Sequence, residues 1–171
     1  MNSQKQSQLL KRLLMPFSIF VCAIFLCSQA QAQEEPPKPI AVTVSTAQNL
    51  SFGTFIQNGN SGTVTVMPLG GRTATGSIIL PGMFSIVTPA LFIVNALPGT
   101  LITISNGANS KIYNGGFYLD LQVGGSSTGS PFVVSSNPTS VYIGGTLTVG
   151  PLSSNPAGAY SGTFDVTFIQ Q

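Results

Sequence analysis

The chain has 171 residues, of which 43% are hydrophobic and 6% are charged, and it contains no histidine and no tryptophan. Charged residues make up about a quarter of an average soluble domain. Disordered chains combine low hydrophobicity with high net charge, and nucleic-acid-binding proteins need a basic surface, whereas the formal net charge here is +2. The composition therefore excludes a disordered chain and a nucleic-acid-binding module, and it indicates a weakly charged, glycine-rich domain.

The first 32 residues have the features of a secretory signal peptide. The basic residues come first: Lys5, Lys11 and Arg12. A mostly apolar run over residues 13–27 follows, and residues 30–32 (AQA) place small side chains where signal peptidase reads the chain. We expect cleavage after residue 32 and export by a Sec-type route to the periplasm, the cell surface or the medium of a Gram-negative bacterium.

Two other interpretations of this segment fit less well. A transmembrane helix needs about 20 apolar residues, and Pro16 interrupts the shorter run here. A lipoprotein anchored at Cys22 or Cys27 needs a small residue before the cysteine, and Val21 and Leu26 are not small. Cleavage would remove both cysteines, so we expect no disulfide in the exported chain and a fold that depends on its core.

Residues 33–39 (QEEPPKP) are expected to form a proline-rich tether ahead of a single domain over residues 40–171. Alternating apolar residues, or short β-branched and aromatic runs, occur at residues 40–44, 63–67, 78–80, 84–87, 91–94, 101–104, 117–123 and 132–134. The expected turns are Asn58-Gly59, Gly70-Gly71, Asn106-Gly107, Asn114-Gly115-Gly116, Gly124-Gly125, Asn137-Pro138, Gly144-Gly145 and Asn155-Pro156. This pattern predicts an all-β chain, an immunoglobulin-like antiparallel β-sandwich.

Glycines and threonines recur at the ends of the expected strands. The motifs are residues 40–42 (IAV), 50–53 (LSFG), 62–66 (GTVTV), 71–76 (GRTATG), 144–149 (GGTLTV) and 158–168 (GAYSGTFDVTF). Together they resemble the bacterial family catalogued as domain of unknown function 4402 (DUF4402). The resemblance covers nearly all of the chain after the leader. It implies an exported, immunoglobulin-like domain with kinship to pilin-like surface subunits, and it implies no catalytic residue.

We expect no enzyme activity, no cofactor and no metal site. General acid–base catalysis most often uses histidine, which is absent, and no cysteine nucleophile remains after residue 32. Zinc ligands are lacking for the same reason, and no loop clusters the oxygen ligands that Ca²⁺ requires. Asp120 and Asp165 could form a carboxylate pair, but each stands between apolar residues, so alternation points both carboxylates away from the core.

Arg72 is the candidate recognition residue, because a guanidinium suits an acidic partner. It stands between Gly71 and Thr73. The alternatives are a structural ion pair with Asp120 or Asp165, or a position in a solvated loop, and these structural roles are favoured.

The leading functional hypothesis is a non-catalytic structural or adhesive module at the cell surface or in the periplasm, with a pilin-like subunit as its most specific form. The expected partners are copies of the chain or other surface subunits and a periplasmic chaperone, with no nucleic acid and no membrane span after processing. The alternative is a monomeric secreted binding domain that recognises a glycan or peptide through its loops. The tyrosines that could stack on sugars are Tyr113, Tyr118, Tyr142 and Tyr160.

Two segments are candidate assembly strands. One face of the expected last strand carries Tyr160, Phe164, Val166 and Phe168. This layout is similar to the C-terminal motif of chaperone-assembled pilus subunits, although Gln170 stands where those subunits usually carry an aromatic residue. The alternating residues behind the tether are Ile40, Val42 and Val44. Such a strand can be lent to a neighbour, but the favoured alternative is that it pairs within its own domain.

Overall fold

The computed structural model describes residues 41–44, 48–82 and 85–171. All of them belong to the second of the two units into which the chain divides, Lys38–Gln171. The predicted leader (residues 1–32), the predicted tether (residues 33–39) and Ile40 lie outside the described residues. Within the described part of the chain, no helix has the length and apolarity that a membrane span requires.

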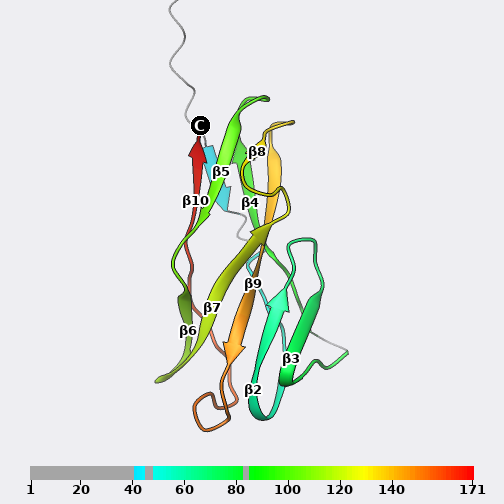
Figure 1. Ribbon diagram of the computed structural model, residues 1–171, viewed down its shortest axis with the longest axis vertical. Helices are drawn as coiled ribbons and strands as arrows, with labels where there is room; N and C mark the ends of the chain where they lie inside the picture. The colour runs from blue at the N-terminus through cyan, green and yellow to red at the C-terminus, as the bar shows by residue number, and fades with distance from the viewer. Residues whose placement is uncertain (1–40, 45–47, 83–84) are drawn as a thin grey trace, which may run out of the picture. The chain divides into compact units, whose positions relative to one another are not determined.

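The described residues form ten strands and no helix (Figure 1). The strands are β1 (Ala41–Val44), β2 (Ile56–Val66), β3 (Arg72–Ile79), β4 (Ala90–Asn95), β5 (Leu101–Asn106), β6 (Ser110–Asn114), β7 (Phe117–Ser126), β8 (Phe132–Val133), β9 (Thr139–Val149) and β10 (Val166–Gln170). They make two sheets, and every pairing between these strands is antiparallel. The predicted all-β, antiparallel sandwich is confirmed.

The larger sheet is organised around β9. One edge of β9 pairs with β7, which pairs in turn with β6. The opposite edge carries two strands in succession, because residues 139–143 pair with β4 and residues 145–149 pair with β2. β1 extends the sheet beyond β4, and β3 extends it beyond β2. β9 therefore runs the length of the sandwich and changes partner at Gly144.

The smaller sheet, in the order β10-β5-β8, covers one half of the larger sheet. Its inward side chains pack against those of β4 and the first half of β9. We call this cluster the upper core, and its buried residues are Ala90, Phe92, Val94, Ile102, Val123, Phe132, Val134, Val141 and Ile143. This half of the molecule is a sandwich with a strand-built layer on each side of its core.

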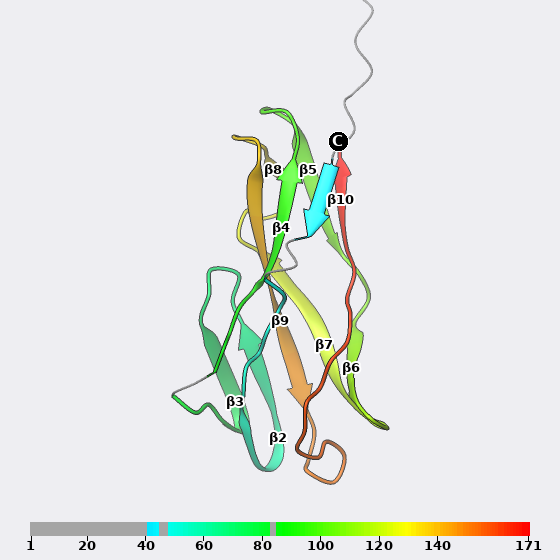
Figure 2. The ribbon, with the colours of Figure 1, turned by 180° about the vertical axis from the view of Figure 1, so that it is seen from behind.

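The other half of the larger sheet has a second cluster, which we call the lower core. Its buried residues are Phe52, Val64, Val66, Ile78, Leu119, Leu121, Leu147 and Val149. None of them belongs to the smaller sheet. Instead, two irregular segments, residues 50–55 and residues 157–164, run over the sheet on either side of β9 (Figure 2). The second layer of the sandwich is therefore built by strands over one core and by irregular chain over the other.

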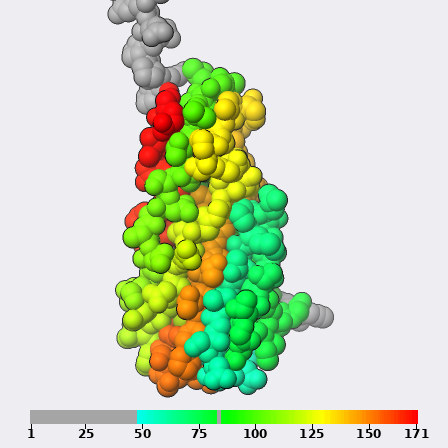
Figure 3. Space-filling view, in the orientation of Figure 1, coloured from blue at the N-terminus to red at the C-terminus, as the bar shows by residue number. Residues whose placement is uncertain are grey.

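The face of the larger sheet that points away from the cores is rich in threonine. Figure 3 shows β9 in orange between β7 and β2. The threonines of β2, β3 and β9 lie side by side in register, and they are Thr63, Thr65, Thr73, Thr75, Thr146 and Thr148. The hydroxyls of Thr63 and Thr75 are 2.7 Å apart, and those of Thr65 and Thr146 are 2.9 Å apart. Valine inside and threonine outside is the alternation from which the strand over residues 63–67 is predicted.

Three predicted turns lie inside strands. Asn58-Gly59 falls within β2, Gly124-Gly125 within β7 and Gly144-Gly145 within β9. The pairing register shifts between Gln57 and Gly62 and again between Val123 and Ser126. Two of these predicted turns therefore mark irregularities in strand pairing, and the third marks the change of partner of β9, because glycine tolerates such irregularities without ending the strand.

The strand predicted over residues 84–87 is wrong for residues 85–87, and Phe84 lies outside the described residues. Thr88 alone forms a β-bridge, to Ser51. Beside it, side-chain bonds replace the ladder: Ser51 Oγ donates to the Ile86 carbonyl at 2.8 Å, and Ser85 Oγ accepts from the Thr54 amide at 2.6 Å. Hydroxyl groups that bond to the backbone in this way compete with regular pairing.

Candidate functional site

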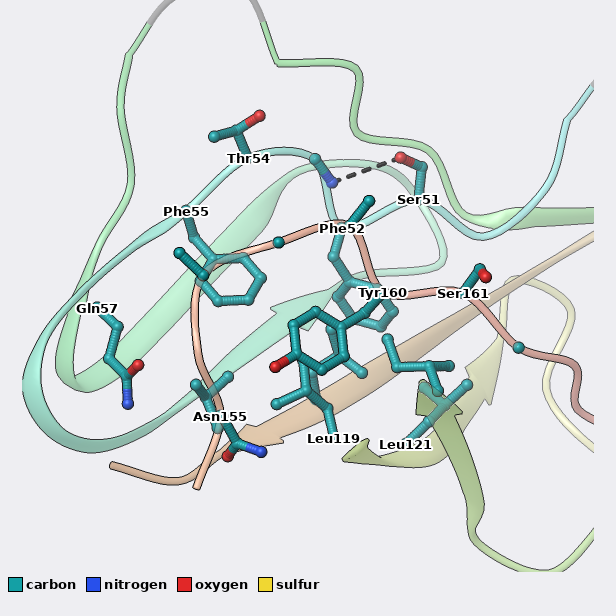
Figure 4. A pocket seen from close by; sticks show the side chains of 18 of the residues that line it. Ser51, Phe52, Thr54, Phe55, Gln57, Leu119, Leu121, Asn155, Tyr160 and Ser161 are labelled. Atoms are coloured by element: carbon teal, nitrogen blue, oxygen red, sulfur yellow. Dashed lines mark hydrogen bonds between the residues drawn. The ribbon is translucent and has the colours of Figure 1, made fainter. Parts of the chain in front are cut away.

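A groove of about 850 Å³ opens over the lower core (Figure 4). It lies between two stretches of chain, residues 50–57 and residues 155–164, which we call the first wall and the second wall. The floor is apolar and comes from β7 and β9: Leu119, Leu121, Leu147 and Val149. Every residue that lines the groove is uncharged.

Three aromatic side chains cover the floor. Phe52 and Phe55 come from the first wall and Tyr160 from the second, and all three point into the groove in Figure 4. They pack against the lower core, and the Tyr160 hydroxyl donates to the Pro156 carbonyl at 2.8 Å. The leucines of the floor are thus shielded from water by rings and not by a strand.

The first wall owes its shape to Gly53. Phe52 and Phe55 are three residues apart, so they would face opposite sides of a regular strand. Gly53 has φ +63°, a conformation that side-chain-bearing residues rarely adopt, and it breaks the alternation so that both rings turn inward. The outer edge of this wall is held by β3, because Arg72 Nη1 donates to the carbonyls of Phe52 (2.6 Å) and Thr54 (2.8 Å).

The second wall is held along its outer edge by other neighbours. Ser161 exchanges two backbone hydrogen bonds with Tyr113 of β6, at 2.8 and 3.0 Å, and the Gly107 amide donates to the Asp165 carbonyl at 2.9 Å. The start of the wall is fixed by Asn155, whose Nδ2 donates to the Tyr118 carbonyl at 2.6 Å and whose Oδ1 accepts from the Gly150 amide at 2.5 Å. Both walls are therefore anchored on the side away from the groove.

The backbone edges that face the groove are open. In an extended chain, successive residues direct their N–H and C=O groups to opposite edges. Ser161, Asp165 and Thr54 bond outward, and the residues between or beside them are Phe55, Tyr160, Gly162 and Phe164. Within the described chain, no hydrogen bond occupies the backbone groups of these four residues. The first wall contributes one of these residues, Phe55, and the second wall contributes the other three.

The family follows from a comparison with known proteins. Residues 42–169 match the family described as "Domain of unknown function (DUF4402)". The chain belongs to the DUF4402 family. No curated protein and no solved structure matches it.

Of the four residues of this DUF4402 domain that were expected on one face of the last strand, only Val166 and Phe168 lie in a strand, β10. Tyr160 packs against the lower core, Val166 and Phe168 against the upper core, and Phe164 against both. β10 itself begins only at Val166, because residues 162–165 are irregular. Val42 and Val44 lie in β1, which pairs with β4 of the same chain.

Asp120 and Asp165, considered above as a possible carboxylate pair, are not brought together by any strand pairing. Asp120 lies on β7, exposed, and pairs with Lys111 of β6 at 3.3 Å, while Asp165 is exposed beside Gly107. The prediction that both carboxylates point away from the core is confirmed. Among the described residues, no three His, Cys, Asp or Glu side chains form a cluster suited to a metal.

Lys111 also lies over the ring of Tyr118, with Nζ 3.2 Å from the ring centroid. Partial desolvation lowers the pKa of its ammonium, but the neighbouring Tyr118 and Asp120 outweigh that effect and raise the pKa above its usual value. Tyr118 in turn stands 6.3 Å from Tyr113, centroid to centroid. The β6–β7 hairpin therefore presents a small exposed cluster of two rings and one ion pair.

The sequence predicted neither the groove nor the structural role of Arg72, which donates hydrogen bonds to the carbonyls of Phe52 and Thr54. The signals were present in the spacing of Phe52 and Phe55, which a period of two cannot place on one face, and in the glycine between them. Asn155 was expected only as part of a turn. The alternatives of an ion pair between Arg72 and Asp120 or Asp165 are wrong, because Arg72 bonds to carbonyl groups and Asp120 pairs with Lys111.

Replacement of Arg72 by alanine should lower the free energy of unfolding by about 1–2 kcal/mol, because hydrogen bonds from a charged group to two backbone carbonyls are lost. Urea unfolding of the chain without its leader measures this. The matched control is Lys111→Ala, which removes a charge from an exposed ion pair and should cost less than about 1 kcal/mol. If Arg72→Ala is as stable as the parent, the structural role of Arg72 is contradicted. The hypothesis that Arg72 recognises an acidic partner would then be favoured.

Proposed function

We propose that this DUF4402 domain is a non-catalytic structural module that is exported and that associates noncovalently with copies of itself at the cell surface or in the periplasm. One observation carries the proposal: the groove over the lower core, where the second layer of the sandwich has no strand. The lining of this groove is uncharged and mostly apolar, and the groove has backbone groups without partners among the described residues, features that favour association with another protein.

Composition supports the same function. Residues 33–171 hold seven charged side chains: Glu34, Glu35, Lys38, Arg72, Lys111, Asp120 and Asp165. Edge strands that avoid pairing with other chains usually carry charges as a defence, and β1 and β3 carry one charged residue between them, Arg72. Little charge repulsion opposes contact between copies.

The test is the state of assembly of the exported chain. Sedimentation velocity over a hundredfold range of concentration, with electron microscopy of the same samples, should show a shift from monomers to oligomers or filaments as concentration rises. Cell fractionation should place the protein outside the cytoplasm. A chain that stays monomeric at every concentration would exclude the structural module.

A specific observation favours a second candidate function, a monomeric secreted domain that binds a glycan. Tyr113 and Tyr118 are 51% and 44% exposed and lie together with Lys111 on the β6–β7 hairpin. Exposed rings of this kind offer flat surfaces for sugars, with polar groups at their rim. A monomer that binds glycans and loses this binding on Tyr118→Ala would establish the second function in place of the first.

A further inference from the structure

We propose that Asn58 is a site of spontaneous deamidation, where the chain exchanges a side-chain amide for a carboxylate by a reaction with its own backbone. This chemistry is independent of the proposed function, because it needs only the chain and water. The motif that allows it is an asparagine followed by a glycine. The motif occurs at Asn58-Gly59, Asn106-Gly107 and Asn114-Gly115, and the fold gives each of the three a different setting.

The reaction joins the glycine nitrogen to the asparagine side chain. Hydroxide removes the proton of the glycine amide, and the nitrogen attacks Cγ of the asparagine. A bond forms between this nitrogen and Cγ, the Cγ–Nδ2 bond breaks, and Nδ2 takes a proton from water and leaves as ammonia. Water then opens the cyclic imide at either of its carbonyls, which yields aspartate or isoaspartate. Glycine favours ring closure, because it has no Cβ and its backbone has the widest conformational freedom.

Asn58 lies in a bulge of β2. Pairing with β3 stops after Gln57 and resumes at Gly62, so β2 has four residues, 58–61, where β3 has one, Ser77. β9 pairs with β2 only from Gly62 onward. All four residues of the bulge are exposed. Their backbone therefore lies outside the register of the sheet.

The two reacting groups at Asn58 are free to approach each other. With the described residues, the Asn58 side chain makes no hydrogen bond. Gly59 has φ +89°, and a Cβ built on it would meet no atom within 4 Å. Neither hydrogen bonding of the carboxamide nor crowding at the glycine opposes the attack.

Asn106-Gly107 is equally exposed, but both of its reacting groups are held. The leaving nitrogen, Asn106 Nδ2, donates to the carbonyls of Val123 at 3.3 Å and Gly124 at 2.8 Å. The attacking nitrogen, that of Gly107, donates to the Asp165 carbonyl at 2.9 Å. Ring closure would break these hydrogen bonds, so this pair reacts only when the structure opens locally.

Asn114-Gly115 is also restrained. Asn114 is half-buried and pairs with Phe117 in the hairpin between β6 and β7. Its carboxamide packs so closely against Gly158 that a Cβ there would lie 3.0 Å from the carboxamide carbon. Asn58 is therefore the site at which the fold leaves the reaction open.

The test is the rate of conversion at each site. The purified chain is incubated at neutral and at mildly alkaline pH, and mass spectrometry of its peptides follows the change from amide to acid. Asn58 should convert at least about tenfold faster than Asn106, because the hydrogen bonds of Asn106 add to its activation barrier. Both rates should rise with pH, since the deprotonated amide is the nucleophile.

Unfolding the chain in urea is the control for the role of structure. Each asparagine is then followed by a glycine in an open chain, and the rates at Asn58 and Asn106 should come within about threefold of each other. Equal rates in the folded chain, or a ratio no larger folded than unfolded, would overturn the proposal. Asn58→Gln should abolish the early gain of negative charge seen by isoelectric focusing, because its longer side chain closes a ring less readily.

The product has a predictable effect on charge and stability. Residues 33–171 carry three positive and four negative side chains, so conversion at Asn58 changes the formal net charge from −1 to −2. The variant Asn58→Asp carries this charge from the start. It should unfold at the same urea concentration as the parent, because residue 58 lies outside the ladder. A clear loss of stability in Asn58→Asp would show that the Asn58 amide is held in the fold, against the proposal.

Discussion

Truncation of Leu119 to alanine should lower the free energy of unfolding by about 2–4 kcal/mol, as large-to-small changes in a core do. Leu119 is 2% exposed and packs in the lower core with Leu121 and Leu147. The loss has two parts, the apolar surface no longer buried and the cavity left under Tyr160 and Phe55. Equilibrium urea unfolding of the chain without its leader measures the change.

The control is Leu69→Ala, at a leucine that is 86% exposed in the turn between β2 and β3. That substitution should change the free energy of unfolding by less than about 0.5 kcal/mol. If Leu119→Ala were as harmless as Leu69→Ala, the inward face of β7 would be assigned wrongly. The floor of the groove would then be wrong as well.

Gly144→Ala should cost about 2–3 kcal/mol, although it adds a single methyl group. A Cβ at this position would collide with the carbonyl oxygen of Val66 and would lie 3.1 Å from the Cδ atom of Pro68. Backbone atoms cannot rotate away as side chains do, so β9 must shift against β2 to make room, and forced backbone shifts in a packed region are costly. Thermal and urea unfolding both report the loss.

Gly125→Ala is the matched control for this glycine. Gly125 sits at the bulge of the adjacent strand β7, and a Cβ there meets no atom within 4 Å. Alanine at Gly125 should therefore be neutral or slightly stabilising, because it reduces the freedom of the unfolded chain. Equal losses at Gly144 and Gly125 would contradict the close approach of β9 to Val66.

The fold was largely predictable because most strands show the alternation of a half-buried surface. Over residues 117–123 the alternation places Phe117, Leu119, Leu121 and Val123 on one face. The last three are buried in β7, whereas Phe117, the first residue of the strand, is 44% exposed. What alternation cannot supply is the neighbour of each strand. The alternation of apolar residues shows which face of β9 is buried. It does not show that β9 changes partner from β4 to β2, because that change depends on contacts between residues far apart in the sequence.

The candidate site was not predictable from the same pattern. The groove depends on Gly53, whose positive φ turns Phe52 and Phe55 to one side, and on a second wall that has a partner on one edge only. Arg72 was recognised as notable, but a guanidinium that bonds to carbonyl groups leaves no trace in sequence, since backbone acceptors are present at every residue. The role of such a residue follows from its position in space.

Because β9 runs through both cores, it determines how the domain unfolds. Ile143 lies in the upper core and Leu147 in the lower core of one continuous strand, and Phe164 packs against both clusters. If β9 detaches from one half of the domain, the other half loses its central strand as well. The two halves therefore unfold as one cooperative unit. The amides of β9 are then the slowest of the domain to exchange with solvent, because only global unfolding exposes them.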